Sequence, residues 1–151
     1  MTLHKLIEAD LPLILTWRNA PEVRYFMYSH HEISEADHRT WFARMEHDPQ
    51  ALWYLYKGEN DRPDGVVYFT QYRPENQSSF LGYYAAPDAP AGTDTKLSMS
   101  ALDKAFNEFN LHKVNAEVLI TNDLSLHFHE KLGFNREGIF RDYHFDGEGF
   151  V

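Results

Sequence analysis

Three consecutive β-rich segments in the first half of the chain limit its possible folds more than any other feature. These segments are residues 51–57, 66–72 and 79–85. Residues 60–65 (Asn-Asp-Arg-Pro-Asp-Gly) are strong turn formers, so they join the first two segments into a hairpin. We therefore expect adjacent strands of a hairpin-rich sheet in this half.

Helices surround these strands on both sides in the sequence. Before them we expect a short strand at 3–7 and helices at 10–18, 21–27 and 34–47, the first and third capped by Asp10 and Ser34. After them we expect a helix at 97–109, a strand at 113–120, a helix at 122–132 ended by Gly133, and a strand or hairpin at 135–151 that turns at 146–147. A hairpin-rich half joined to a strand–helix–strand half predicts an α+β fold, with a mixed sheet and helices on both faces.

Length and composition exclude several classes of protein. The 151 residues fit a single domain, residues 1–151, and the absence of cysteine excludes disulfides and thiolate nucleophiles. A formal charge of −9 argues against nucleic acid as a partner, but one phosphorylated cofactor can still be held by main-chain amides at a helix start. The chain has no apolar run long enough to span a membrane and no signal-peptide core at its N-terminus. We therefore expect a cytoplasmic protein with no membrane partner.

The nine histidines do not predict a metal site. His127 and His129 are two residues apart, so their side chains diverge on a helix. His30 and His31 lie in a loop without cysteine or a second histidine at helical spacing. We expect no bound metal.

The region between Gly82 and Phe134 carries the most specific motifs. It contains Gly-Tyr-Tyr-Ala-Ala-Pro at 82–87, Gly-Thr at 92–93 before a long helix, and Asn-x-x-Ser at 122–125 in a helix that ends Glu-Lys-Leu-Gly-Phe at 130–134. Together these motifs resemble the core of the GNAT N-acetyltransferase superfamily. The resemblance covers nearly the whole chain.

This resemblance implies a fold and a reaction. The fold would be a three-layer α/β/α domain with a mixed, mostly antiparallel sheet. The reaction would move an acetyl group from acetyl-CoA to a primary amine, by direct attack in a ternary complex. The family also continues into a closing strand after Gly149, whereas this chain stops at Val151. We expect either a shortened protein or a sheet edge that a neighbouring chain covers, in a monomer or a homodimer.

The cofactor site implied by the resemblance lies where the strand at 79–85 leads into the helix near Gly92. The residues expected to contact acetyl-CoA are Tyr83, Tyr84, Ala85, Gly92, Thr93, Asp94, Thr95, Asn122 and Ser125. The family's loop pattern is kept only at Gly92, and Asp94 would repel a diphosphate unless it caps the helix or Lys96 offsets it. A bulge at 83–85 would expose amides for the pantetheine arm, although an ordinary strand fits the sequence equally well. Asn122 fits a helix cap, a cofactor donor or both.

Two residues are candidates for proton transfer. Glu117 lies among apolar neighbours and is either a general base for the amine or an ion-paired structural carboxylate. His129 occupies the place where many members of the resembled family carry a tyrosine that protonates the leaving thiolate. The alternative for His129 is a hydrogen-bonded, half-buried histidine.

The N-terminal half is expected to bind the acceptor, through Arg18, Met27, Tyr28 and Trp41, or else to place some of these residues in the core. Its motifs resemble the GNAT branch that acetylates a UDP-linked 4-amino-4,6-dideoxy sugar in pseudaminic acid synthesis. The alternatives are an N-terminal acetyltransferase of ribosomal proteins and an inactive acyl-CoA-binding module.

Overall fold

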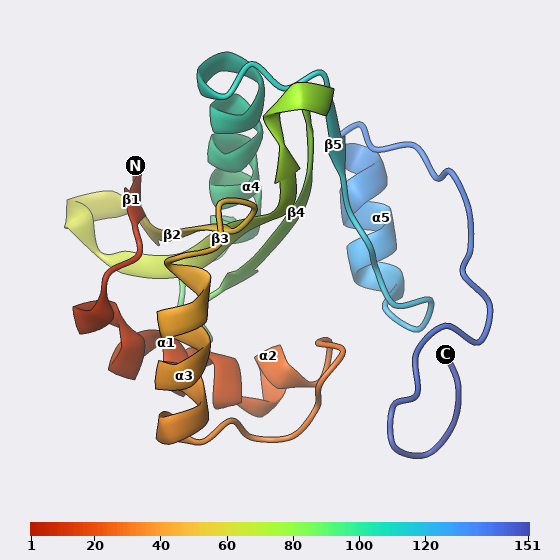
Figure 1. The fold of residues 1–151 in the computed structure, drawn as a ribbon, viewed down its shortest axis with the longest axis horizontal. Coiled ribbons are helices and arrows are strands. Elements are labelled where there is room, and N and C mark those ends of the chain that lie inside the picture. The colour runs from red at the N-terminus through yellow and green to blue at the C-terminus, as the bar shows by residue number, and fades with distance from the viewer.

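A computed structural model describes residues 1–151 and contains one five-stranded sheet (Figure 1). The strands are β1 (Thr2–Lys5), β2 (Leu52–Lys57), β3 (Pro63–Arg73), β4 (Ser78–Ala85) and β5 (Lys113–Asn115). They lie in the order β1-β2-β3-β4-β5. The first four are antiparallel to their neighbours, and β5 runs parallel to β4. The predicted mixed, mostly antiparallel sheet is confirmed.

Helices cover both faces of this sheet, as predicted. They are α1 (Leu11–Asn19), α2 (Pro21–Arg24), α3 (Glu35–Met45), α4 (Thr93–Asp103) and α5 (Asp123–Lys131). Figure 1 shows α1 and α3 on one side of the sheet, α4 on the other, and α5 beside β5. A single π-helical turn, Lys104–Glu108, continues α4. No helix combines the length and the apolar character that crossing a membrane requires.

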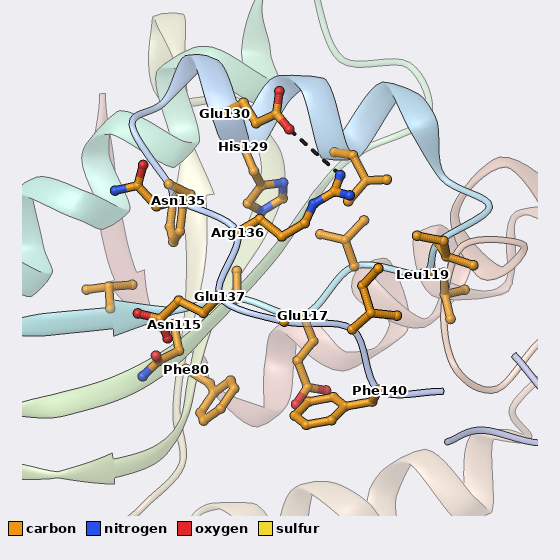
Figure 2. A pocket seen from close by; sticks show the side chains of 18 of the residues that line it. Phe80, Asn115, Glu117, Leu119, His129, Glu130, Asn135, Arg136, Glu137 and Phe140 are labelled. Carbon is orange, nitrogen blue, oxygen red and sulfur yellow. Dashed lines mark ion pairs between the residues drawn. The ribbon is translucent and has the colours of Figure 1, made fainter. Parts of the chain in front are cut away.

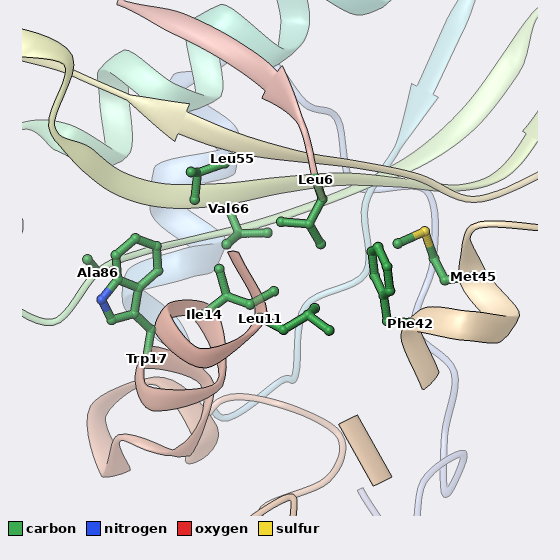
Figure 3. Close-up of a cluster of buried hydrophobic side chains, with 9 residues drawn as sticks. All are labelled: Leu6, Leu11, Ile14, Trp17, Phe42, Met45, Leu55, Val66 and Ala86. Carbon is green, nitrogen blue, oxygen red and sulfur yellow. The ribbon is translucent and has the colours of Figure 1, made fainter. Parts of the chain in front are cut away.

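Two hydrophobic clusters form because side chains alternate between the faces of each strand. On β3, Val66 faces α1 and α3, whereas Val67 and Phe69 face α4. The first cluster consists of Leu6, Leu11, Ile14, Trp17, Phe42, Met45, Leu55, Val66 and Ala86 (Figure 3). In the second, Leu97, Ala101 and Ala105 are fully buried, which confirms the four-residue spacing expected of the helix.

The parallel pair β4–β5 is short, and its early end shapes the rest of the molecule. Only three residue pairs are matched, the last being Phe80 with Asn115. The predicted strand at 113–120 is therefore wrong beyond Asn115. Residues 116–120 have a β-rich pattern, but a strand also needs a neighbouring strand to pair with. β4 turns away from the chain at this point, so these residues have no such partner (Figure 1). The edge of β4 that follows Phe80 consequently has no strand beside it.

Three further expectations differ from the structure. The bulge expected at 83–85 is absent, because pairing with β3 is regular from Ala85 to Phe80; the irregularity lies in β3, where Gln71 adopts a φ of 49°. The second helix ends at Arg24 instead of Met27. The segment 135–151 adds no strand to the sheet and forms only the bridge between Phe145 and Phe150. Its predicted turn is present, since the Asp146 carboxylate accepts hydrogen bonds from the amides of residues 148 and 149.

Candidate active site

A large cavity lies between β5, α5 and the C-terminal segment. Its volume is about 1120 Å³, which is enough for a drug-sized ligand or larger. The walls come from residues 112–120, the inner face of α5 and residues 132–144. Three predicted site residues line it: Tyr28, Glu117 and His129. Figure 2 shows the last two. The cavity therefore unites the two candidates for proton transfer with one candidate for acceptor binding.

Glu117 lies just past the end of β5 and points into this cavity (Figure 2). The hydroxyl of Tyr28 donates a hydrogen bond of 2.6 Å to its Oε2 atom. No lysine, arginine or histidine lies within ion-pair distance of the carboxylate. The alternative of an ion-paired structural carboxylate is therefore wrong, and Glu117 is free to accept a proton.

His129 sits on α5 with both ring nitrogens engaged. Its Nδ1 atom is 2.7 Å from the carbonyl oxygen of Ser125, so Nδ1–H donates to that carbonyl. Its Nε2 atom is 3.4 Å from the Tyr83 hydroxyl, and the two rings stack with centroids 5.6 Å apart. The Ser125 bond fixes the neutral tautomer, which leaves Nε2 as the acceptor of the pair. A protonated ring would donate from Nε2 instead.

Tyr83 connects this cavity to the start of α4. Burial raises the pKa of its phenol above the ordinary value, and the nearby Asp94 carboxylate raises it further. The hydroxyl therefore stays protonated at neutral pH. The neighbouring side chain of Tyr84 points to the opposite face, where it packs against the first cluster, and burial raises its pKa too. Tyr84 and Ala85 can thus meet a ligand at this edge only through their main chain.

The start of α4 offers unpaired amides. Gly92 is the N-cap, with a left-handed φ of 85°, so the alternative in which Asp94 caps the helix is not the one observed. Thr93 bonds through both its amide and its hydroxyl to the Pro90 carbonyl. The amides of Asp94 and Thr95 have no partner within the chain. Free amides at the positive end of a helix suit a diphosphate.

The Asp94 side chain weakens this arrangement. Its carboxylate makes no cap hydrogen bond, and burial raises its pKa above the ordinary value. The ammonium group of Lys96 lies 3.5 Å from a carboxylate oxygen of Glu59 and makes no ion pair with Asp94. An ionised Asp94 therefore opposes a negatively charged ligand at the helix start.

The other predicted residues lie outside the cavity and have structural contacts. Asn122 caps α5 by accepting a hydrogen bond of 3.2 Å from the Ser125 amide. Arg18 donates to the Ser29 carbonyl at 2.9 Å, and burial lowers the pKa of its guanidinium. Trp41 packs against the first cluster and meets Trp53 edge-on at 4.7 Å, so its core alternative is the one observed. Met27 is half-buried and does not line the cavity.

The C-terminal segment supplies residues that the sequence analysis missed. His144 lies with Nε2 2.6 Å from the Tyr28 carbonyl oxygen and its ring 4.8 Å from the Tyr28 ring. Phe134 meets His129 edge-on at 5.2 Å, and Phe140 lies near Glu117 (Figure 2). The aromatic residues around position 144 were the available signal for a ligand-facing surface, but the same pattern also predicts a closing hairpin. Nowhere in the chain do three histidine, cysteine or acidic side chains gather as a metal-binding group.

The mixed sheet has a parallel pair, β4 and β5, that parts after Phe80, and the two candidates for proton transfer, Glu117 and His129, line the cavity beside this gap. These are the features expected of an acyl-CoA-dependent acyltransferase. The acetyltransferase (GNAT) domain family matches residues 1–135. The chain belongs to this family, whose members are acetyl-CoA-dependent.

Individual relatives agree with this assignment. The probable N-acetyltransferase YjcK of Bacillus subtilis is 33% identical over 100 residues, which cover 65% of this chain and 55% of that protein. The spermidine N(1)-acetyltransferase of Vibrio cholerae is 24% identical over 139 residues, covering 91% of this chain and 80% of that one. This chain therefore spans about half the length of the Bacillus relative.

Solved structures confirm the fold. The crystal structure of the Vibrio cholerae spermidine N-acetyltransferase in complex with CoA and spermine superimposes with a TM-score of 0.90 at 23% identity. The match covers 99% of this chain and 89% of that one. The spermidine/spermine N-acetyltransferase of the same organism in complex with manganese ions gives a TM-score of 0.80 at 22% identity, covering 99% of this chain and 86% of that one. The predicted α+β GNAT fold is confirmed.

Proposed function

We propose that this chain transfers an acetyl group from acetyl-CoA to a primary amine carried by a small molecule. One observation carries the proposal: Glu117 and His129 line the same cavity, beside the point where β4 and β5 part. A carboxylate and an imidazole are the two side chains that the proton transfers of amide formation need. Acetyl-CoA, when bound, supplies the activated acetyl group as a thioester.

The first part of the site would hold acetyl-CoA. The free amides of Asp94 and Thr95 can donate to its diphosphate at the positive end of α4. The unpaired edge of β4 after Phe80 can bond the extended pantetheine arm as a neighbouring strand would. Amides of this edge also suit the carbonyl oxygen that gains charge during transfer.

The second part would move protons. Glu117 accepts a proton from the ammonium form of the acceptor, which leaves a nucleophilic amine. The amine nitrogen bonds to the acetyl carbon as the carbon–sulfur bond breaks, and the nitrogen then releases its second proton to solvent to give the neutral amide. The departing thiolate receives a proton from the pair formed by His129 and Tyr83, whose hydroxyl and Nε2 lie 3.4 Å apart. Solvent returns a proton to this pair and takes the proton held by Glu117, which restores the site. Losing a positioned acid or base of this kind typically costs about 10²- to 10⁴-fold in rate.

We propose a UDP-linked amino sugar as the acceptor. Supporting this are the sequence motifs of the N-terminal half and the rings of Tyr28, Tyr143 and His144, which line the cavity and offer flat surfaces for a sugar or a base. A polyamine is the second candidate. The formal charge of −9, the carboxylate of Glu117 and the substrate named for the Vibrio cholerae relative favour it.

A panel of amines would test both candidates. CoA release would be followed with a UDP-4-amino sugar, with spermidine and with a basic N-terminal peptide. We expect the highest kcat/KM with the UDP-4-amino sugar, and Glu117→Gln should lower its kcat at least 100-fold. A higher value with spermidine would replace the sugar with the polyamine. Calorimetry that finds no acetyl-CoA binding at millimolar concentration would refute the enzyme itself.

A further inference from the structure

Tyr28 links three segments that are distant in the sequence, and the proton transfers above use only one of them, the segment of Glu117. Tyr28 lies in the loop after α2, Glu117 follows β5, and His144 belongs to the C-terminal segment. The Tyr28 hydroxyl donates to Glu117 Oε2 at 2.6 Å, and His144 Nε2 donates to the Tyr28 carbonyl oxygen at 2.6 Å. The contacts span 89 and 116 residues of sequence, so neither is a by-product of local structure.

We propose that Tyr28 is a positioning residue that aims the Glu117 carboxylate at the acceptor amine, and that His144 holds Tyr28 in place. This inference rests on the proposed function, in which Glu117 accepts the proton of the acceptor. The phenol occupies Oε2 and leaves Oε1 without a partner in the chain. The carboxylate is thereby fixed in one orientation with one oxygen open to the ligand.

The loop that carries Tyr28 is tied to α1 by side-chain hydrogen bonds to residues that follow Tyr28. The amide of Ile33 donates to Asn19 Oδ1 at 2.8 Å, and Asn19 returns a bond of 2.9 Å to the Ile33 carbonyl. Arg18 bonds the Ser29 carbonyl at 2.9 Å. These bonds hold the loop against α1, so the Tyr28 ring reaches Glu117 from a fixed base, although 44% of its surface is exposed.

Hydrogen bonds within the C-terminal segment also hold His144 in place for its contact with Tyr28. The amides of Tyr143 and His144 both donate to the Val151 carbonyl at 3.0 Å, and the Val151 amide returns a bond of 2.7 Å to the His144 carbonyl. This loop presents the His144 ring to the loop at Tyr28. The charged and titratable groups that face the Tyr28 phenol are Glu117, His144, Tyr143 and Tyr68.

The phenol is suited to act as a permanent donor. Burial and the bond to Glu117 raise the pKa of Tyr28 well above its ordinary value. It therefore keeps its proton across the range in which the enzyme works and remains a hydrogen-bond donor to the carboxylate. Removing the hydroxyl should free the carboxylate to rotate.

Tyr28→Phe tests this role, because it keeps the ring and deletes only the donor. We expect kcat to fall about 10- to 100-fold, the range for a hydrogen bond to a charged group, with the KM for acetyl-CoA unchanged. Tyr25→Phe is the matched control, since Tyr25 is an exposed tyrosine of the same loop without a side-chain hydrogen bond, and it should behave as the wild type.

A second pair of variants tests His144. His144→Gln keeps an amide donor near the position of Nε2, whereas His144→Phe keeps only a ring. We expect His144→Phe to reproduce most of the Tyr28→Phe defect and His144→Gln to recover at least half of the lost rate. Equal rates in the two variants would overturn the role of His144.

The failure of this inference can be separated from that of the proposed function. In a Glu117→Gln background, adding Tyr28→Phe should lower kcat by less than about 2-fold, because its target is already gone. If Glu117→Gln alone keeps the wild-type rate, the base assignment is wrong. If Glu117→Gln is inactive while Tyr28→Phe retains the wild-type rate, only the positioning role is overturned.

Discussion

Gly82 lies where β4 must pass beneath an aromatic stack, and replacing it should weaken the fold measurably. A Cβ atom at this position would overlap the Tyr68 ring and lie 2.5 Å from its hydroxyl oxygen. The ring cannot simply move aside, because it stacks on Trp53 with centroids 4.2 Å apart and an interplanar angle of 11°. Gly82→Ala must therefore both strain the strand pairing and disrupt the stack.

The expected loss of unfolding free energy follows from the steric strain and from the disrupted stack. Overpacking of this kind costs about 1–3 kcal/mol, and a lost aromatic stack about 0.5–1.5 kcal/mol. We therefore expect Gly82→Ala to lose about 2–4 kcal/mol of unfolding free energy. For a domain of this size, that loss lowers the Tm by about 5–15 °C.

Thermal melts and urea unfolding would measure this effect. Gly138→Ala is the control, since a Cβ there meets nothing within 4 Å, and it should change stability by less than about 0.5 kcal/mol. In a Tyr68→Ala background the added cost of Gly82→Ala should fall below about 1 kcal/mol. A Gly82→Ala protein that melts within about 1 °C of the wild type would refute the steric argument.

Three further variants test the active site and its supports. His129→Ala should lower kcat by about 10- to 1,000-fold in a CoA-release assay with little change in acetyl-CoA affinity, and a wild-type rate would exclude it as the acid. Asp94→Asn should tighten acetyl-CoA about 3- to 10-fold in calorimetry, the scale of removing one charge near a diphosphate in a water-like medium; weaker binding would contradict the predicted repulsion. Burial raises the pKa of the Asp94 carboxyl in the folded protein, so the wild type loses stability as the pH rises from the ordinary aspartate pKa through this raised value. Asp94→Asn should therefore be more stable than the wild type at pH 7 but not at pH 3. Asn122→Ala should lose about 1 kcal/mol in urea unfolding while Asn122→Asp loses little, and equal melting of the two would show that the cap contributes nothing.

Local rules predicted much of the fold. The four-residue spacing of Leu97, Ala101 and Ala105 identified the buried face of α4, because helix geometry alone places these residues in line. Ser34 and Asn122 were recognised as helix caps, because a capping side chain bonds a main-chain amide only three residues further along the chain. The order of the elements was correct up to α5, but the strand expected at 135–151 is absent from the sheet.

What the sequence could not predict depends on neighbours distant in the chain. The end of β5 at Asn115 is decided by the course of β4, so the strand pattern at 113–120 could not reveal it. The meeting of Tyr28 with Glu117 joins residues that no periodicity relates. Arg18 was expected to contact the acceptor, and no local pattern could reveal that its Nη2 atom donates to the Ser29 carbonyl, eleven residues further on.

The bond between His144 and Tyr28 has a consequence for how the protein can be assembled. Both hydrophobic clusters consist of residues up to Leu111, so their members are complete when three quarters of the polypeptide has been synthesised. The side of the pocket facing the amine is finished only when the final stretch folds back onto a loop made near the beginning. A ribosome-bound or clipped chain that lacks this stretch would thus retain its packed interior but lack the contact of His144 with Tyr28, which supports Glu117.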